Sequence, residues 1–129
     1  TLELGNRIHF KGFVPPSDLD IERQHAAVFV VPNIDSTVGR FHTSPLKLFE
    51  AMAARRPLVA SNLPAIREVL THERNALLVP PSNPRALATA LCSLMSDRQR
   101  AERLAATAFE DVQQYSWDKR AEKICSLLD

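Results

Sequence analysis

The sequence predicts an α/β fold in which short buried strands alternate with helices around a mostly parallel sheet. Two observations predict it. Residues 27–31, 58–60 and 76–79 are apolar runs that end at a proline or a polar turn, as expected of strands buried on both faces. Between and after these runs, apolar residues recur at helical spacing. Alternation of this kind favours parallel strands joined by helices.

The first part of the chain supplies two expected strands and one expected helix. Residues 7–10 alternate between polar and apolar side chains, which predicts a strand. A helix is expected over residues 17–24, because Ser17 offers a cap at its start. Residues 27–31 then form a buried strand, and residues 33–43 are polar enough to predict a loop.

The remaining elements follow from helix caps and apolar runs. Ser44 can cap a helix that has Pro45 at its first position and reaches Ala53. Two further strands are expected, and a short helix at residues 66–70 lies between them. Three helices complete the chain, and they are expected at residues 84–96, 98–113 and 117–128.

Composition indicates a soluble single domain and excludes some partners. The chain has 129 residues, of which 45% are hydrophobic and 24% charged, values ordinary for a globular domain. Sixteen basic and fifteen acidic residues leave a net charge of +1, which gives no electrostatic case for binding nucleic acid. We expect no signal peptide and no membrane-spanning helix, since no apolar run approaches the ~20 residues needed.

The cysteines and the tryptophan are expected to have structural roles. Cys92 and Cys125 are expected to be reduced core thiols, with a disulfide as the alternative. Trp117 is expected to pack the last helix back onto the fold. The charged residues of the first helix, Asp18 and Glu22 among them, are expected to be solvated surface groups.

Residues 42–53 carry the most suggestive chemistry. They join two predicted parallel strands, and ligands of such sheets bind where loops meet helix N-termini. A helix start at Ser44 would present free N–H groups to a phosphate. Lys47 adds a positive charge, and Glu50 lies three residues further on the same face. A carboxylate there can accept two hydrogen bonds from a ribose diol, so the segment predicts a nucleotide diphosphate site.

A plainer interpretation of the same residues stays open. Lys47 and Glu50 could form an ordinary surface ion pair, which would contribute well under ~1 kcal/mol. The Ser44-Pro45 dipeptide could be only a helix start.

Longer stretches resemble a known family. The residues from Leu46 to Val59 read LKLFEAMAARRPLV, and they resemble the glutamate-bearing helix and following strand of GT-B glycosyltransferases of the retaining, nucleotide-sugar-dependent family (glycosyl transferases group 1, family 4). The stretches that match in order are RIHFKGFVPPSDL, AAVFVVPN, ASNLPAIREVL, NALLVPPSNPRALATAL and YSWDKRAEKI. The resemblance covers nearly the whole chain. It implies the C-terminal half of a GT-B fold, with a partial doubly wound (Rossmann-like) parallel sheet and flanking helices.

The resemblance also implies roles for individual residues. Glu50 stands where the family's second glutamate binds the donor ribose, and His42 stands where the first glutamate usually contacts the donor sugar. His42 as a solvated loop residue is the alternative. The backbone at residues 13–15 is implied to line the nucleobase pocket, the alternative being an apolar end under the next helix. The implied donor-binding residues are Phe13, Val14, Pro15, His42, Thr43, Ser44, Pro45, Leu46, Lys47 and Glu50. No catalytic residue and no metal ligand stands out.

The implied function is transfer of a hexose, with retention, from a UDP- or GDP-linked donor to a sugar or lipid-linked acceptor. No tightly bound cofactor is expected, and the implied location is cytoplasmic, with a membrane-peripheral parent left open. A proline at position 45 removes a backbone donor that the family's usual glycine would supply. This departure keeps a non-catalytic nucleotide-binding or interaction module open as an alternative. A nucleotide-sugar epimerase of similar fold is a third and weaker reading.

The chain is expected to be a fragment of its domain. The family's first strands, which carry an arginine and a lysine for the diphosphate, and its N-terminal acceptor domain do not match any part of residues 1–129. In the usual strand order 3-2-1-4-5-6, residues 7–10 would be the third strand and the later runs the fourth to sixth. The fragment is therefore expected to be inactive alone and to expose a strand edge at residues 28–31, which could pair with another chain.

Overall fold

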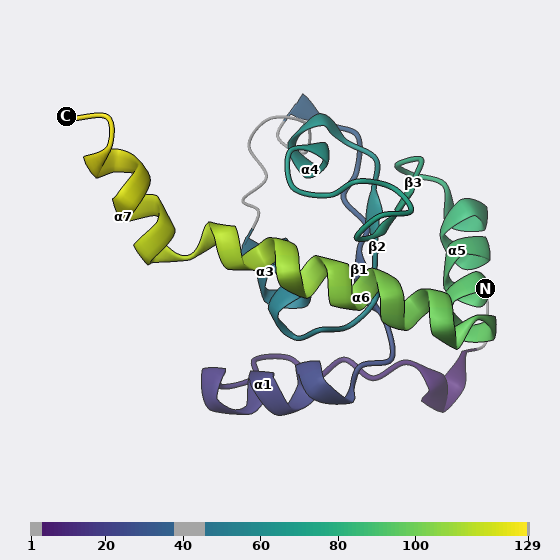
Figure 1. Ribbon diagram of the computed structural model, residues 1–129. Coiled ribbons are helices and arrows are strands. Elements are labelled where there is room, and N and C mark those ends of the chain that lie inside the picture. The colour runs from purple at the N-terminus through teal and green to yellow at the C-terminus, as the bar shows by residue number, and fades with distance from the viewer. Residues whose placement is uncertain (1–3, 38–45, 129) are drawn as a thin grey trace.

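The computed structural model describes residues 4–37 and 46–128, and a three-stranded parallel sheet lies at its centre (Figure 1). The strands are β1 (Phe29–Val31), β2 (Leu58–Ser61) and β3 (Leu77–Val79), paired in that order. Because parallel neighbours require crossover connections, helices α3 (Leu46–Ala53) and α4 (Pro64–Arg67) lie between successive strands. The expected α/β fold and its last three strands are confirmed.

Helices cover both faces of the sheet. Alternate residues of β2 point to opposite sides, so Leu58 and Ala60 pack with α3 and α4, whereas Val59 packs with α5 (Pro84–Ser96). Helix α6 (Arg98–Val112) serves both layers, because Leu104 belongs to one and Ala108 to the other. The result is the Rossmann-like arrangement that the sequence predicted.

Side-chain caps start the two long helices. Asn83 precedes α5, and its Oδ1 accepts a hydrogen bond of 3.0 Å from the backbone N–H of Ala86. Asp97 ends α5 and caps α6 by accepting a bond of 3.0 Å from the N–H of Arg100. Side-chain acceptors at these positions satisfy N–H groups that have no partner inside the helix. The predicted bounds of α5 are confirmed, and those of α6 differ by one residue at the end.

A polar cluster fastens the turn before β3 to α6. Arg74 donates two hydrogen bonds to Asp111 of α6, one of them 2.8 Å long. The buried Asn75 donates a third, also of 2.8 Å, and its Oδ1 accepts from the N–H of Thr71. The hydrogen bonds from Arg74, joined by that from Asn75, outweigh burial and hold the pKa of Asp111 below its usual value. The ionised form of Asp111 is therefore part of the native structure.

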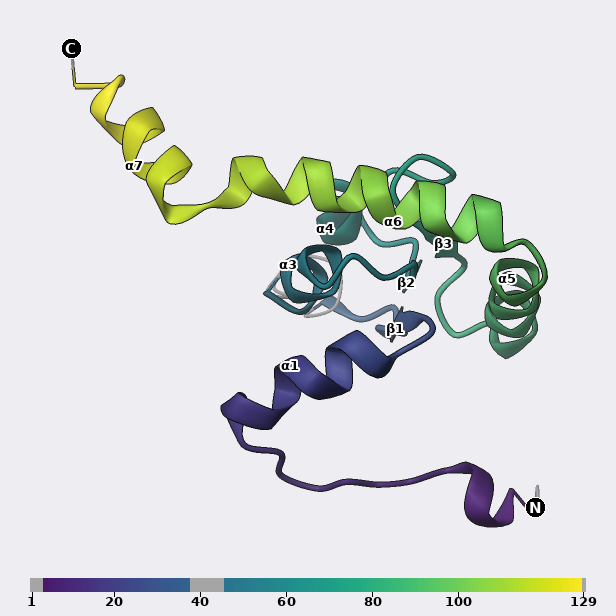
Figure 2. The ribbon, with the colours of Figure 1, turned by 60° about the horizontal axis from the view of Figure 1, so that its bottom comes forward.

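The N-terminal segment departs from the prediction. Residues 7–10 form no strand, because η1 (Gly5–Arg7) is a 3-10 turn and the residues after it pair with no described strand. A strand needs a neighbour for its N–H and C=O groups, and this segment runs apart from the sheet (Figure 2). Phe10 is 95% exposed, and helix α1 (Pro16–His25) contains no buried residue. The expected helix is present, whereas the expected strand is wrong.

The C-terminal helix also departs from the prediction. Helix α7 (Trp117–Cys125) has no buried residue, and it extends away from the body in both views (Figures 1 and 2). Trp117 is 82% exposed, with the guanidinium of Arg120 5.8 Å from its ring centre. Just before α7, Tyr115 stacks on Phe49 of α3, with 4.7 Å between the ring centres. Trp117 does not pack α7 onto the fold, because no described surface faces it.

The cysteines are not core residues. Cys92 and Cys125 are both free and exposed, so the expectation of reduced thiols in the core is wrong about their position. Cys92 lies on the solvent side of α5, whose buried stripe is formed by Ala90 and Leu94.

We expect substitution by alanine to lower the free energy of unfolding much more in the core than in the C-terminal helix. Leu104→Ala removes a fully buried side chain from a packed layer and should lower the free energy of unfolding by about 2–5 kcal/mol. Trp117→Ala, the matched control, removes a larger but exposed side chain and should change it by less than about 0.5 kcal/mol. Urea unfolding followed by circular dichroism measures both. A large loss with Trp117→Ala would contradict the exposed position of α7.

We expect the Asp111 cluster to give a pH-dependent contribution to stability. Asp111→Ala removes the acceptor of Arg74 and leaves the buried amide of Asn75 with only its 3.3 Å bond to the backbone oxygen of Val69, so it should cost about 1–3 kcal/mol at pH 7. Because the pKa of Asp111 is lowered in the folded chain, its contribution is present above about pH 4, the unfolded value, and is lost as the pH falls further. Unfolding of the variant and of Glu110→Ala, an exposed neighbour, at pH 7 and pH 3 checks this. An equal deficit of Asp111→Ala at both pH values would contradict it.

Candidate functional site

The carboxyl ends of the three strands enclose a cavity at the edge where parallel sheets bind ligands. Its volume is about 250 Å³, and its wall is formed by the strand ends and the start of α5. Most of the wall is apolar, and the Asn83 side chain in it already caps α5. None of the described residues predicted to bind the donor lines this cavity. The predicted site therefore lies elsewhere on the described surface, around α3.

Helix α3 is fixed by its buried face. Leu48, Ala51 and Met52 are at most 2% exposed and pack in the layer between α3 and the sheet. At helical spacing, this places Lys47 and Glu50 on the outer side, where both are exposed. The prediction that Lys47 and Glu50 share the solvent side of one helix agrees with this arrangement.

Glu50 is joined to helix α1 by an ion pair. Its Oε2 lies 3.0 Å from Nη2 of Arg23, and the Glu50 side chain remains 52% exposed. Nη1 of the same guanidinium donates to Oδ1 of Asp20 at 2.8 Å. Lys47 and Glu50 do not pair with each other, so the alternative of an ordinary Lys47–Glu50 pair is wrong. The carboxylate of Glu50 is held by a residue from another helix.

The surroundings keep Arg23 fully charged. A cleft of about 280 Å³ separates α1 from α3, and Asp20, Arg23, Gln24 and Glu50 are among the residues that line it. Burial alone would lower the pKa of Arg23, but the hydrogen bond to Asp20 and the charge of Glu50 outweigh it, so the pKa is raised above its usual value. The cleft thus contains one fixed cation between two carboxylates.

The other residues implied by the resemblance fall into two groups. Phe13 is 89% exposed, Val14 is partly buried and Pro15 is exposed, so Phe13 does not pack under the next helix. Pro15 is the residue that precedes α1. Leu46 is 64% exposed at the start of α3. The remaining residues, His42, Thr43, Ser44 and Pro45, lie outside the described residues, and their roles stay predictions.

Sequence reasoning missed Arg23. The charges of α1 were expected to be solvated, and Asp18 and Glu22 are exposed as expected. Arg23 is only 21% exposed at its side chain, because Glu50 and Asp20 bracket it. The i,i+3 spacing of Asp20 and Arg23 could have shown the first contact. No local pattern could have shown the second, which joins residues on two helices separated by a strand.

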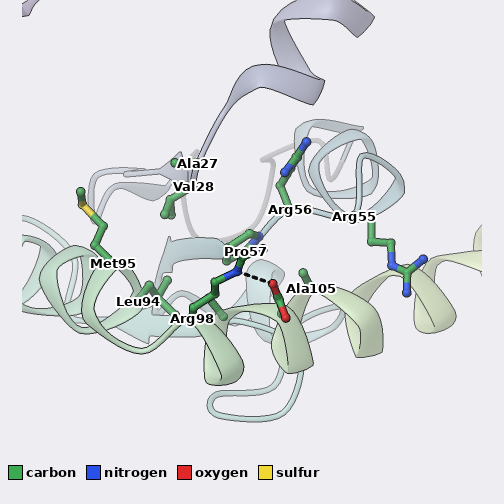
Figure 3. Close-up of a pocket in the computed structure, with 11 residues that line it drawn as sticks. Ala27, Val28, Arg55, Arg56, Pro57, Leu94, Met95, Arg98 and Ala105 are labelled. Carbon is green, nitrogen blue, oxygen red and sulfur yellow. Dashed lines mark hydrogen bonds and ion pairs between the residues drawn. The ribbon is translucent and has the colours of Figure 1, made fainter.

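A larger cavity lies at the amino ends of the strands (Figure 3). Its volume is about 640 Å³, and Arg55, Arg56 and Arg98 are among its lining residues. Figure 3 shows that their side chains point in different directions, and that Arg98 is paired with Glu102 at 2.7 Å. The three guanidinium groups do not converge, so this cavity is not an assembled anion site.

Two further features can be stated for the part of the chain that the structure describes. It contains no group of three or more histidine, cysteine, aspartate or glutamate side chains placed to hold a metal ion. Its helices are all too short or too polar to cross a membrane.

A three-stranded parallel sheet with helices on both faces, and an acidic residue displayed on the helix that follows edge strand β1, is typical of the Rossmann-like domains found in GT-B glycosyltransferases. Comparison with known proteins gives the particular family. The family model described as Glycosyl transferases group 1 matches residues 1–97, and the chain belongs to this family.

The relatives and structural neighbours agree with this assignment. The phosphatidyl-myo-inositol mannosyltransferase of Mycobacterium leprae is 36% identical over 126 residues, which are 98% of this chain and 32% of the relative. Sucrose-phosphate synthase from Thermosynechococcus elongatus superposes with a TM-score of 0.83 at 29% identity, over 98% of this chain and 30% of that one. The Anabaena protein HepE, solved in complex with UDP-glucose, shares the fold with a TM-score of 0.77 at 23% identity. The match covers 98% of this chain and 33% of HepE. The chain thus spans about a third of the length of the proteins that it matches.

Proposed function

We propose that this chain contributes the donor-nucleotide site of a glycosyltransferase, which transfers a hexose from a UDP- or GDP-linked donor to a sugar or lipid-linked acceptor. The observation that carries the proposal is the orientation of the Glu50 side chain. Three buried neighbours fix its helix, and its half-exposed carboxylate faces a cleft instead of the core. Membership of a glycosyltransferase family, with a mannosyltransferase among the relatives, supports sugar transfer as the reaction.

Each residue of the site has a distinct task in this proposal. The carboxylate of Glu50 accepts hydrogen bonds from the two ribose hydroxyls, while Lys47 and the start of α3 attract the diphosphate. During transfer the bond between the sugar and the diphosphate breaks, and negative charge grows on the departing phosphate oxygen. Fixed positive groups stabilise that charge and so lower the barrier. In this proposal the backbone of residues 13–15 lines the nucleobase pocket, and His42 contacts the donor sugar.

The nucleotide is proposed as a substrate, and no tightly bound cofactor is invoked. HepE, which shares the fold, is solved with UDP-glucose, so this fold can hold a nucleotide sugar. Retention of the sugar's configuration follows the family resemblance and is part of the proposal. The proposed location is cytoplasmic, with a membrane-peripheral parent as the other option.

We further propose that the chain is a fragment that needs a longer parent for activity. It spans about a third of its relatives. Strand β1 stands at an edge of the three-stranded sheet, and Val30 in it is 37% exposed. The exposed apolar residues of the C-terminal helix and tail, among them Trp117, Ile124 and Leu128, also lack a covering surface among the described residues. An acceptor-binding domain supplied by the parent would complete the catalytic cleft.

We expect removal of the Glu50 carboxylate to weaken nucleotide binding. Glu50→Ala should cost about 1–3 kcal/mol in the binding of UDP or GDP, because two ribose hydroxyls lose a charged acceptor. Isothermal titration calorimetry measures the affinity, and Glu68→Ala, which removes another exposed glutamate, is the control. Unchanged affinity in Glu50→Ala would remove Glu50 from the site. Absence of binding of any nucleotide to the wild-type chain would favour the non-catalytic interaction module.

We expect the open edge of β1 to cause self-association. An exposed apolar edge offers unpaired N–H and C=O groups to a second copy. Val30→Lys should shift the chain towards monomer, because a lysine at the edge opposes pairing. Sedimentation velocity over a range of concentrations measures this, and Gln99→Lys adds the same charge on α6 as a control. A wild-type chain that stays monomeric at every concentration would contradict the expectation.

A further inference from the structure

Helix α1 is attached to the body chiefly by polar contacts. None of its ten residues is buried, so no side chain of α1 belongs to the apolar core. Two contacts reach it from α3 and the residues that follow α3. One is the ion pair between Arg23 and Glu50 at 3.0 Å, and the other is a hydrogen bond that Arg56 donates to the backbone oxygen of Gln24. Of these two contacts, the Arg23–Glu50 pair is the one that joins α1 to α3 itself.

Residues 13–15, which are proposed to line the nucleobase pocket, directly precede α1. Pro15 is the cap residue of α1, and Phe13 and Val14 come directly before it. Arg23 lies eight positions after Pro15, which corresponds to about 12 Å along a helix axis. A rigid helix of this length links the base segment to the Arg23–Glu50 pair.

Arg23 is itself held in place. Nη1 donates to Asp20 at 2.8 Å, and Nη2 reaches Oε2 of Glu50, so the two ends of the guanidinium engage different carboxylates. This contact uses Oε2 alone, and a carboxylate has about four lone-pair sites in total. Glu50 can therefore accept hydroxyl groups from a ligand while Arg23 remains bound. This geometry allows Arg23 to hold the Glu50 carboxylate in place without competing with a ligand for it.

We propose that Arg23 is a positioning residue of the nucleotide site, which orients the Glu50 carboxylate towards the ribose. This rests on the proposed function, because it concerns how Glu50 meets a ribose. Arg23 touches neither the sugar nor the phosphate in this proposal, and it acts through Glu50 alone. Its loss should thus reduce recognition of the ribose hydroxyls more than attraction of the diphosphate.

The test compares UDP with 2′-deoxy-UDP by calorimetry, and GDP with 2′-deoxy-GDP, on the full chain. Arg23→Met should weaken binding of the ribonucleotide about threefold to fivefold, as expected for loss of a half-exposed ion pair. It should leave binding of the deoxynucleotide nearly unchanged, so that the preference for ribose falls. Arg23→Lys, which keeps the charge, should recover part of this preference. In a Glu50→Ala background, Arg23→Met should have no further effect.

The outcomes separate this proposal from the one on which it rests. Equal weakening of ribo- and deoxynucleotides by Arg23→Met, or wild-type affinity in that variant while Glu50→Ala loses binding, would overturn the role of Arg23 and leave Glu50 in the site. Wild-type affinity in Glu50→Ala, or no binding by the wild-type chain, would overturn the proposed function and the role of Arg23 with it. Arg98→Met, which breaks the Arg98–Glu102 pair on α6, is the matched control and should bind like wild type.

Discussion

The rest of the site depends on one constraint, the burial of three α3 side chains, Leu48, Ala51 and Met52, against the sheet. These side chains pack against the sheet with almost no exposure, so α3 cannot rotate without exposing apolar surface. The opposite side of the helix must then face outward, and it carries Glu50. Every contact discussed for Glu50, from Arg23 to the proposed ribose, follows from this orientation.

Much of the sheet could be predicted from the sequence because its signals are local. The apolar runs that became β2 and β3 end at turn-forming residues, and the caps Asn83 and Asp97 mark helix starts by their own hydrogen bonds. Such features depend on residues a few positions apart. The same holds for the outward face of α3, which the spacing of its apolar residues predicts.

The failures concern residues whose environment is set from far along the chain. Residues 7–10 alternate like a strand, yet a strand forms only beside a partner, and none of the described strands lies next to them. Trp117 does not pack the last helix onto the fold as expected, because packing needs a facing surface and α7 extends away from the body. Arg23 meets Glu50 across two helices, which no local pattern encodes. In each case the missing information is tertiary.

The elements that depart from the prediction are also those that would be left uncovered if the chain is a fragment. A longer parent could cover the edge strand β1 and the helices α1 and α7, which contain no buried residue. By contrast, the core between α3 and the sheet is formed by residues of this chain. The nucleotide site should therefore be measurable in the isolated chain even if sugar transfer is not. An NMR titration of the ¹⁵N-labelled chain with UDP and GDP tests this most directly. We expect the largest shifts at the start of α3, at Glu50 and at residues 13–14. Shifts centred instead on Asn83 and the start of α5, or no shifts at all, would contradict a donor site on α3.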